Sequence, residues 1–256
     1  MSLGRTDGIV IGRRALGESD RLVTFYTRDF GRVSGVARAA RRPRSRFGSA
    51  LELLTLGHLV FFDTGRSDLL RVDHFDITHP FTRLREDLER LGHAAWMVEC
   101  VARLTPEHDP QPALYTLLVR ALRAAEQAGR PGQVAVGFGI RCIDLLGHRP
   151  RLDACLGCGR RYPFVPAYLD APAGGLVCAA CENEAAAPRP ISPAAVGAFE
   201  RVAGGESTAR SLGRTEAELA PLLDGYVSGL IGGPTRTPRF LREVRRLSDA
   251  PGGCRA

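Results

Sequence analysis

Two closely spaced pairs of cysteines constrain the fold of this chain more than any other sequence feature. Four cysteines form two C-x2-C pairs with nineteen residues between the pairs: Cys155, Cys158, Cys178 and Cys181. A four-thiolate zinc site has this spacing, because two intervening residues let one tight turn direct both sulfurs at the same metal ion. Gly157 and Gly159 lie where the first turn needs conformational freedom. The pattern therefore predicts a zinc module.

The expected role of this zinc ion, one per chain, is structural. A closed shell of four cysteines leaves no coordination position for a reacting water molecule. Residues 149–193 are rich in Gly and Pro and have few large apolar side chains, so a metal would stabilise them in place of a core. Four free thiols, two redox-active dithiols and an iron–sulfur cluster remain alternatives. Cys100 and Cys142 lie on or beside apolar stripes and are expected in the core, whereas Cys254 lies in a tail expected to be loose.

The N-terminal third of the chain has the pattern of β structure. Five short runs are rich in Val, Ile, Phe and Thr and are mostly bounded by Gly or Asp: residues 8–14, 21–27, 32–38, 51–62 and 68–78. The sequence Asp29-Phe30-Gly31 predicts a tight hairpin between the second and third runs. Five short strands are too few for an immunoglobulin-like sandwich, but they suit a small five-stranded barrel such as an OB-fold.

After Pro80 the apolar residues recur at helical spacing. Six segments are expected to be helical: residues 84–102, 114–125, 134–146, 192–203, 215–231 and 236–247. The predicted fold class is α+β. An N-terminal five-stranded OB-fold β-barrel at residues 1–80 is followed by an α-helical domain at residues 81–256, with the zinc module inserted at about residues 149–190.

The net charge of the chain is concentrated at one end. The formal net charge is +7, and all 35 basic residues are Arg. Residues 1–48 hold 11 Arg and four acidic residues, whereas residues 49–256 hold 24 of each. Since Arg also replaces Lys in the neutral part, we attribute the absence of Lys to the codon usage of a GC-rich genome. The position of the charge is therefore more informative than its chemistry.

Residues 36–49, here called the basic segment, suit binding to phosphate. This segment carries five Arg within nine residues and no acidic residue: Arg38, Arg41, Arg42, Arg44 and Arg46. Arg13 and Arg14, on the first β run, would extend the patch. Three aromatic residues are candidates for base stacking: Tyr26, Phe30 and Phe47. The alternative is that the charges form a solvated face and the rings fill the barrel.

The sequence lacks the motifs of common enzyme classes. A Walker-type phosphate loop needs a Lys, and neither H-E-x-x-H nor G-x-S-x-G occurs. The six His are scattered, and no nucleophile is placed beside a base, so we expect no enzyme. Neither a signal peptide nor an apolar stretch of ~20 residues occurs. We therefore expect a cytoplasmic protein with no membrane contact and with reduced cysteines.

Three stretches of the sequence resemble RecO, a family of bacterial recombination mediators. Residues 8–46, GIVIGRRALGESDRLVTFYTRDFGRVSGVARAARRPRSR, resemble the start of that family. Residues 146–159, LGHRPRLDACLGCG, and residues 174–181, GGLVCAAC, resemble its zinc-binding region. The order of barrel, helices, cysteines and helices also agrees. The resemblance covers most of the chain, although the segments after residue 192 add little to it.

The resemblance implies an OB-fold, a helical domain with a zinc module, and a role in DNA repair and recombination. It implies binding of single- and double-stranded DNA and annealing of complementary strands. It also implies work with RecR, and with RecF in many bacteria, to load the recombinase RecA onto DNA coated by single-strand binding protein. Such a protein would act at the nucleoid. DNA binding would then fall on the basic segment, and zinc on the four cysteines.

Two alternatives belong to other classes of protein. A zinc-containing structural adaptor would bind RNA or an acidic protein partner through the basic end of the chain. A thiol enzyme would use the C-x2-C pairs for redox chemistry. Competition between single-stranded DNA and structured RNA tests the first alternative, and metal analysis tests the second.

Overall fold

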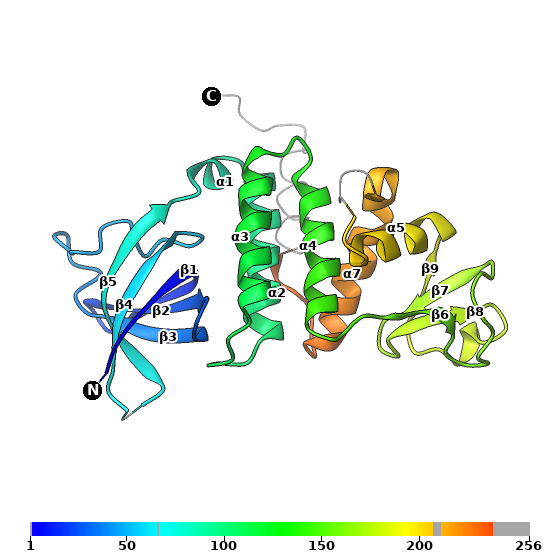
Figure 1. Cartoon of the computed structure of the whole chain (residues 1–256), viewed down its shortest axis with the longest axis horizontal. Helices are drawn as coiled ribbons and strands as arrows, with labels where there is room; N and C mark the ends of the chain where they lie inside the picture. The colour runs from blue at the N-terminus through cyan, green and yellow to red at the C-terminus, as the bar shows by residue number, and fades with distance from the viewer. Residues whose placement is uncertain (1, 66, 207–210, 238–256) are drawn as a thin grey trace. The chain divides into compact units, whose positions relative to one another are not determined.

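The structure, a computed structural model, describes residues 2–65, 67–206 and 211–237. The chain forms two compact units, residues 1–126 and 127–256 (Figure 1). The first unit contains five strands and three helices, and the second contains a small sheet and further helices. The expected helix at residues 236–247 lies almost entirely outside the described residues, as do the tail at 248–256 and Cys254.

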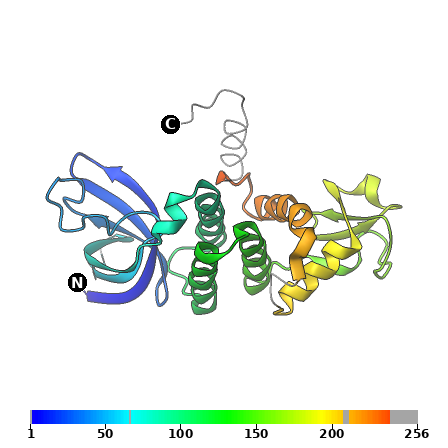
Figure 2. The same ribbon diagram turned by 90° about the horizontal axis from the view of Figure 1, so that it is seen from above.

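The first unit begins with a closed β-barrel (Figure 2). Its strands are β1 (Ser2–Leu16), β2 (Asp20–Thr27), β3 (Gly31–Ala37), β4 (Leu56–Asp63) and β5 (Leu69–His79). Strand β1 pairs with both β2 and β4, so the strand order β1-β2-β3-β5-β4 closes on itself. Strands β3 and β5 are parallel, and the other pairs are antiparallel. This arrangement is an OB-fold, which confirms the predicted fold class.

The alternation of side chains along the strands fills the barrel. In β3 every second residue is buried, as expected for a strand with one face toward a core. The ring centroids of Phe25 and Phe75 lie 5.2 Å apart within that core. The predicted hairpin between β2 and β3 is confirmed. It needs a glycine at Gly31, where φ is +64° and a Cβ would lie 2.2 Å from the carbonyl oxygen of Asp109.

The strand predicted at residues 51–62 is wrong over its first five residues. Residues 51–55 form turns, and β4 begins only at Leu56. Leu51 and Leu54 are fully buried there, so their apolar side chains fill the core without belonging to a strand. A run of buried leucines has the same composition in a strand and in a packed turn, which explains the error.

The first unit continues with α1 (Thr82–Glu86), α2 (Leu88–Leu104) and α3 (Pro112–Gln127). The apolar stripe at residues 84–102 predicts one helix, but the structure divides it at Asp87. The backbone of Asp87 is extended, and its carboxylate accepts a hydrogen bond from the Arg90 amide at 2.9 Å. Asp is among the best residues for starting a helix, and here it starts α2.

The second unit combines three described α-helices with a sheet that the sequence did not predict. The helices are α4 (Pro131–Leu145), α5 (Pro193–Ala203) and α7 (Glu216–Leu230), where helices were expected. The four strands are β6 (Arg151–Cys155), β7 (Ala167–Asp170), β8 (Gly175–Cys178) and β9 (Pro188–Ile191), in the order β6-β8-β7-β9.

Helices α5 and α7 lie beside this small sheet in both views (Figures 1 and 2). Leu169 on β7, Phe199 on α5 and Leu223 on α7 line the same narrow apolar space. Apolar packing therefore joins the cysteine-bearing sheet to the helices of its own unit. No helix in the described part of the chain is long and apolar enough to cross a membrane.

Candidate nucleic-acid interface and metal centre

The basic segment connects β3 to β4 and consists mainly of turns. All five of its arginines are exposed. Arg46 lies 4.0 Å from Asp73, and its guanidinium group stacks 5.0 Å from the centre of the Phe47 ring. Among the described residues, Arg38, Arg42 and Arg44 have no ion-pair partner. Their positive charge is therefore available to an external anion.

Hydrogen bonds hold the start of the basic segment against the β1–β2 hairpin. The carboxylate of Asp20 accepts a hydrogen bond from the Ala39 amide at 2.8 Å. The Arg41 amide donates to the Ser19 carbonyl oxygen at 2.9 Å, and its guanidinium donates to the Gly17 carbonyl oxygen at 2.6 Å. The Ala39 amide, together with the Ser19 hydroxyl, lowers the pKa of Asp20. The ionised form of Asp20 thus helps to fix the loop.

The hairpin and the basic segment together form a pocket lined by guanidinium groups. We call it the arginine pocket; it has a volume of about 190 Å³ and is lined by Arg13, Arg14, Ala15, Arg21 and Arg41. Sequence reasoning missed Arg21. The pairing of strands β1 and β2 could have identified Arg21. It is the cross-strand partner of Ala15 and therefore lies diagonally opposite Arg13.

The three candidates for base stacking differ in the structure. Tyr26 is fully buried and Phe47 is 4% exposed, so both rings fill the core, and no ring face is open to a base. This burial supports the alternative interpretation for these two residues. Phe30 is 39% exposed, although its ring also meets the Phe61 ring edge-on at 5.2 Å. Of the three, Phe30 alone keeps a ring that a base can reach.

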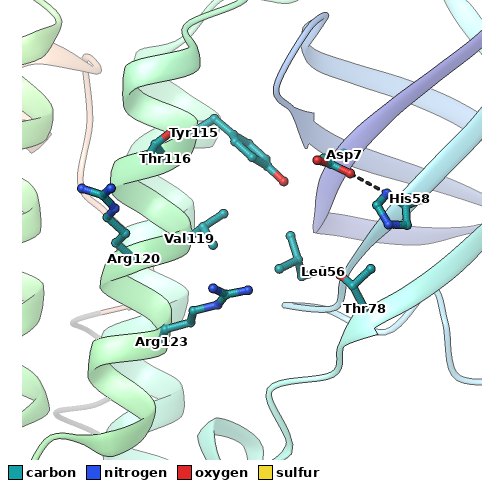
Figure 3. A pocket seen from close by; sticks show the side chains of 9 residues that line it. All are labelled: Asp7, Leu56, His58, Thr78, Tyr115, Thr116, Val119, Arg120 and Arg123. Carbon is teal, nitrogen blue, oxygen red and sulfur yellow. Dashed lines mark ion pairs between the residues drawn. The ribbon is translucent and has the colours of Figure 1, made fainter.

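A second pocket lies between α3 and the barrel, within the first unit (Figure 3). It has a volume of about 310 Å³ and is lined by Asp7, Leu56, His58, Thr78, Tyr115, Thr116, Val119, Arg120 and Arg123. Asp7 lies 2.5 Å from His58, and the Tyr115 hydroxyl points toward Asp7. Burial raises the pKa of Tyr115, and the charge of Asp7 raises it further. The pocket thus has mixed charge, which suits phosphate less well than the arginine pocket.

The four paired cysteines meet in the second unit, as their spacing predicts. Cys155 ends β6 and Cys178 ends β8, and the two other cysteines follow these strands. All four sulfur atoms lie within 4.8 Å of one another, and those of Cys158 and Cys178 are 3.8 Å apart. A tetrahedral zinc site with Zn–S bonds of about 2.3 Å has sulfur–sulfur distances of about 3.8 Å. The residues therefore fit a four-thiolate metal site.

The surroundings of this cysteine cluster shift the pKa values of two of its thiols in opposite directions. Burial by itself raises the pKa of Cys155, but backbone amides, including that of Cys178, donate to its sulfur and lower the pKa to about 6. Burial and the neighbouring sulfurs raise the pKa of Cys181 to about 12. Metal binding would replace the remaining thiol protons. As predicted, Cys100 and Cys142 are buried and do not belong to this cluster.

The structure thus defines a class of protein: an OB-fold barrel with a basic loop, followed by helices and a four-cysteine module. The chain matches the family models "Recombination protein O N terminal" over residues 1–81 and "Recombination protein O C terminal" over residues 85–239. A DNA repair protein RecO of Symbiobacterium thermophilum is 34% identical, with 96% of this chain and 97% of that protein covered. Those of Anaeromyxobacter dehalogenans and Geobacter sulfurreducens are also each 34% identical. The alignments cover 98% and 94% of this chain, and 100% and 98% of those proteins.

These matches extend over nearly the whole chain. The chain belongs to the RecO family of DNA repair proteins.

Proposed function

We propose that this protein is a non-enzymatic recombination mediator. It binds single- and double-stranded DNA, anneals complementary strands, and helps to load the recombinase onto DNA coated by single-strand binding protein. The observation that supports this proposal is the convergence of Arg13, Arg14, Arg21 and Arg41 in one pocket beside the exposed basic segment. A guanidinium group can hold a phosphate through two parallel hydrogen bonds, and several such groups can follow a DNA backbone.

The proposed mechanism of annealing is electrostatic. Arginines on the barrel neutralise phosphates of both strands, reduce the repulsion between them, and allow their bases to pair. No nucleotide hydrolysis is needed for this step. The proposed DNA-binding residues are Arg13, Arg14, Arg21, Arg38, Arg41, Arg42, Arg44 and Arg46, with Phe30 as the exposed ring among the three stacking candidates.

The cysteine cluster is proposed to hold one structural zinc ion. Four thiolates would complete its tetrahedral shell, so the ion supplies cross-linking and no reactive water. Its effect would be to fix the ends of β6 and β8, in a segment whose strands have only four or five residues. Stabilisation by the metal is the expected compensation for so small a sheet.

We propose that residues 1–80 bind DNA and that residues 81–256 bind protein partners. The proposed partners are RecR and single-strand binding protein by contact, and RecF and RecA through the shared pathway. The proposed location is the cytoplasm, at the nucleoid. The neutral charge balance of residues 49–256 supports a role in holding proteins rather than phosphates.

An annealing assay tests this function directly. Complementary strands coated with single-strand binding protein are mixed with the purified protein, with and without RecR, and duplex formation is followed over time. We expect faster annealing than with coated strands alone, without any nucleotide. Unchanged annealing would contradict the proposal. In a parallel titration, binding of structured RNA as tight as that of single-stranded DNA would favour the adaptor alternative instead.

A further inference from the structure

An acidic residue, Glu52, pairs with two arginines of the positive patch on the barrel. The carboxylate of Glu52 forms an ion pair with Arg13 and lies 3.6 Å from the guanidinium group of Arg21. Both arginines line the arginine pocket. The side chains of Glu52, Arg13 and Arg21 are 32%, 37% and 28% exposed, respectively, so water and small ions can reach them.

A third guanidinium group lies within the field of Glu52. Burial lowers the pKa of Arg85, whereas the charge of Glu52 raises it. One terminal nitrogen of Arg85 donates to the Thr55 hydroxyl at 2.9 Å and to the Pro80 carbonyl oxygen. Its Nε is buried and has no hydrogen-bond partner among the described residues. The charge of Glu52 therefore also acts on Arg85, although Arg85 makes its hydrogen bonds to Thr55 and Pro80.

The backbone holds Glu52 in register with β1. The Glu52 amide donates to the Ser49 carbonyl oxygen, and the Thr55 amide donates to that of Glu52, both at 3.1 Å. Two further bonds of 2.9 Å join Leu54 and Thr55 to Val10 on β1. The backbone of Glu52 is therefore fixed beside β1, where its side chain reaches Arg13.

We propose that the arginine pocket is a seat for a phosphodiester group of a DNA strand, and that Glu52, which does not itself line the pocket, engages the guanidinium groups of Arg13 and Arg21 until the strand arrives. A carboxylate presents two oxygens to a guanidinium group in the same way as a phosphate does. When a phosphate binds these two guanidinium groups instead, the partly exposed Glu52 side chain turns into solvent. This inference rests on the proposed function, because the phosphate is that of the bound strand.

Glu52 thus acts as a placeholder that competes with every anion for these arginines. The consequence is selectivity for long polyanions. A single small anion must displace Glu52 without other help, whereas a DNA strand also gains contacts with the basic segment. Glu52 therefore lowers the affinity for every anion, but it leaves a strand with many phosphates as the ligand that still binds. An unfavourable element of this kind is a common source of specificity.

The test uses full-length Glu52→Gln, which removes the charge and keeps the shape of the side chain. Exposed ion pairs are weak, so we expect binding to a single-stranded oligonucleotide to tighten about two- to fivefold at low salt. The gain should shrink as salt screens the charges. The matched control is Glu107→Gln, which changes the net charge equally but breaks a pair with Arg32 at 3.1 Å, outside the pocket. We expect a smaller gain there.

Inorganic phosphate provides a second readout that does not involve DNA. A ligand that binds the folded state raises the melting temperature. Phosphate should raise that of Glu52→Gln more than that of the wild type, and adding Arg21→Ala should remove the difference. Equal or weaker DNA binding by folded Glu52→Gln would overturn the placeholder. Failure of the wild type to bind DNA would overturn the proposed function, while the phosphate measurement would still decide the role of Glu52.

Discussion

At the scale of single residues, Gly157 determines whether the four sulfurs can come together. A Cβ atom at this position would lie 2.8 Å from the sulfur and 2.9 Å from the Cβ of Cys181. Real Cβ atoms do not approach other heavy atoms so closely, so any larger residue requires Cys181 to shift. The C-x2-C spacing alone shows that a turn is needed, but it does not show that this glycine is packed against the opposite pair.

We therefore predict that Gly157→Ala loses most of its zinc. Metal analysis of the wild type should find about one zinc ion per chain with four protected thiols. Gly157→Ala should retain less than half of that and should melt at a lower temperature. Gly129→Ala is the matched control, because nothing lies within 4 Å of a Cβ built there. Equal zinc in both variants would show that the cluster tolerates a side chain at Gly157.

At the scale of elements, the separation of α1 from α2 depends on one carboxylate. The Asp87 side chain bonds the Arg90 amide at 2.9 Å, at the point where the backbone leaves the helical region. Its ion pair with the Arg90 guanidinium, at 3.7 Å, is long and open to solvent on the Asp87 side, so it adds little. The hydrogen bond that caps α2 is thus the main contribution of Asp87 to stability.

Removing this cap should destabilise the first unit measurably. Asp87→Ala is expected to lower the free energy of unfolding by about 1 kcal/mol, the usual cost of losing such a cap. Asp87→Ser keeps an oxygen that can accept the Arg90 amide and should recover most of the loss. Denaturant midpoints with unchanged slopes measure both variants. An equal loss in the two variants would show that the charge of Asp87, rather than its cap, stabilises α2.

Elements with a clear period could be predicted from the sequence, and elements without one could not. Strand β3 has an alternating pattern of burial and helices α3 and α5 bury one stripe of apolar residues, and the predicted ranges agree with these elements. The strands β6 to β9 are too short for a period to appear, and the sheet was missed. The cysteines at the ends of β6 and β8 and the packing of the sheet against α5 and α7 stabilise these strands instead.

At the scale of the whole molecule, the concentration of charge in the first 48 residues explains where DNA binding is expected. The sequence alone identifies the basic segment, because five Arg in nine residues need no structure to be seen. It does not identify Arg21 or Glu52, because both join the site through pairing and turns of the barrel. The sequence also does not show that Tyr26 and Phe47 are buried, because their burial depends on how the barrel packs.

The salt dependence of DNA binding tests the role of the basic segment most directly. Each single-strand phosphate contact contributes about −0.7 to the slope of log affinity against log salt concentration. Arg41→Ala, Arg42→Ala and Arg44→Ala together should therefore flatten the slope by about 2. A comparison variant, Arg120→Ala with Arg123→Ala, removes two exposed arginines outside the basic segment and should change it much less. An unchanged slope in the folded triple variant would contradict DNA binding by this loop.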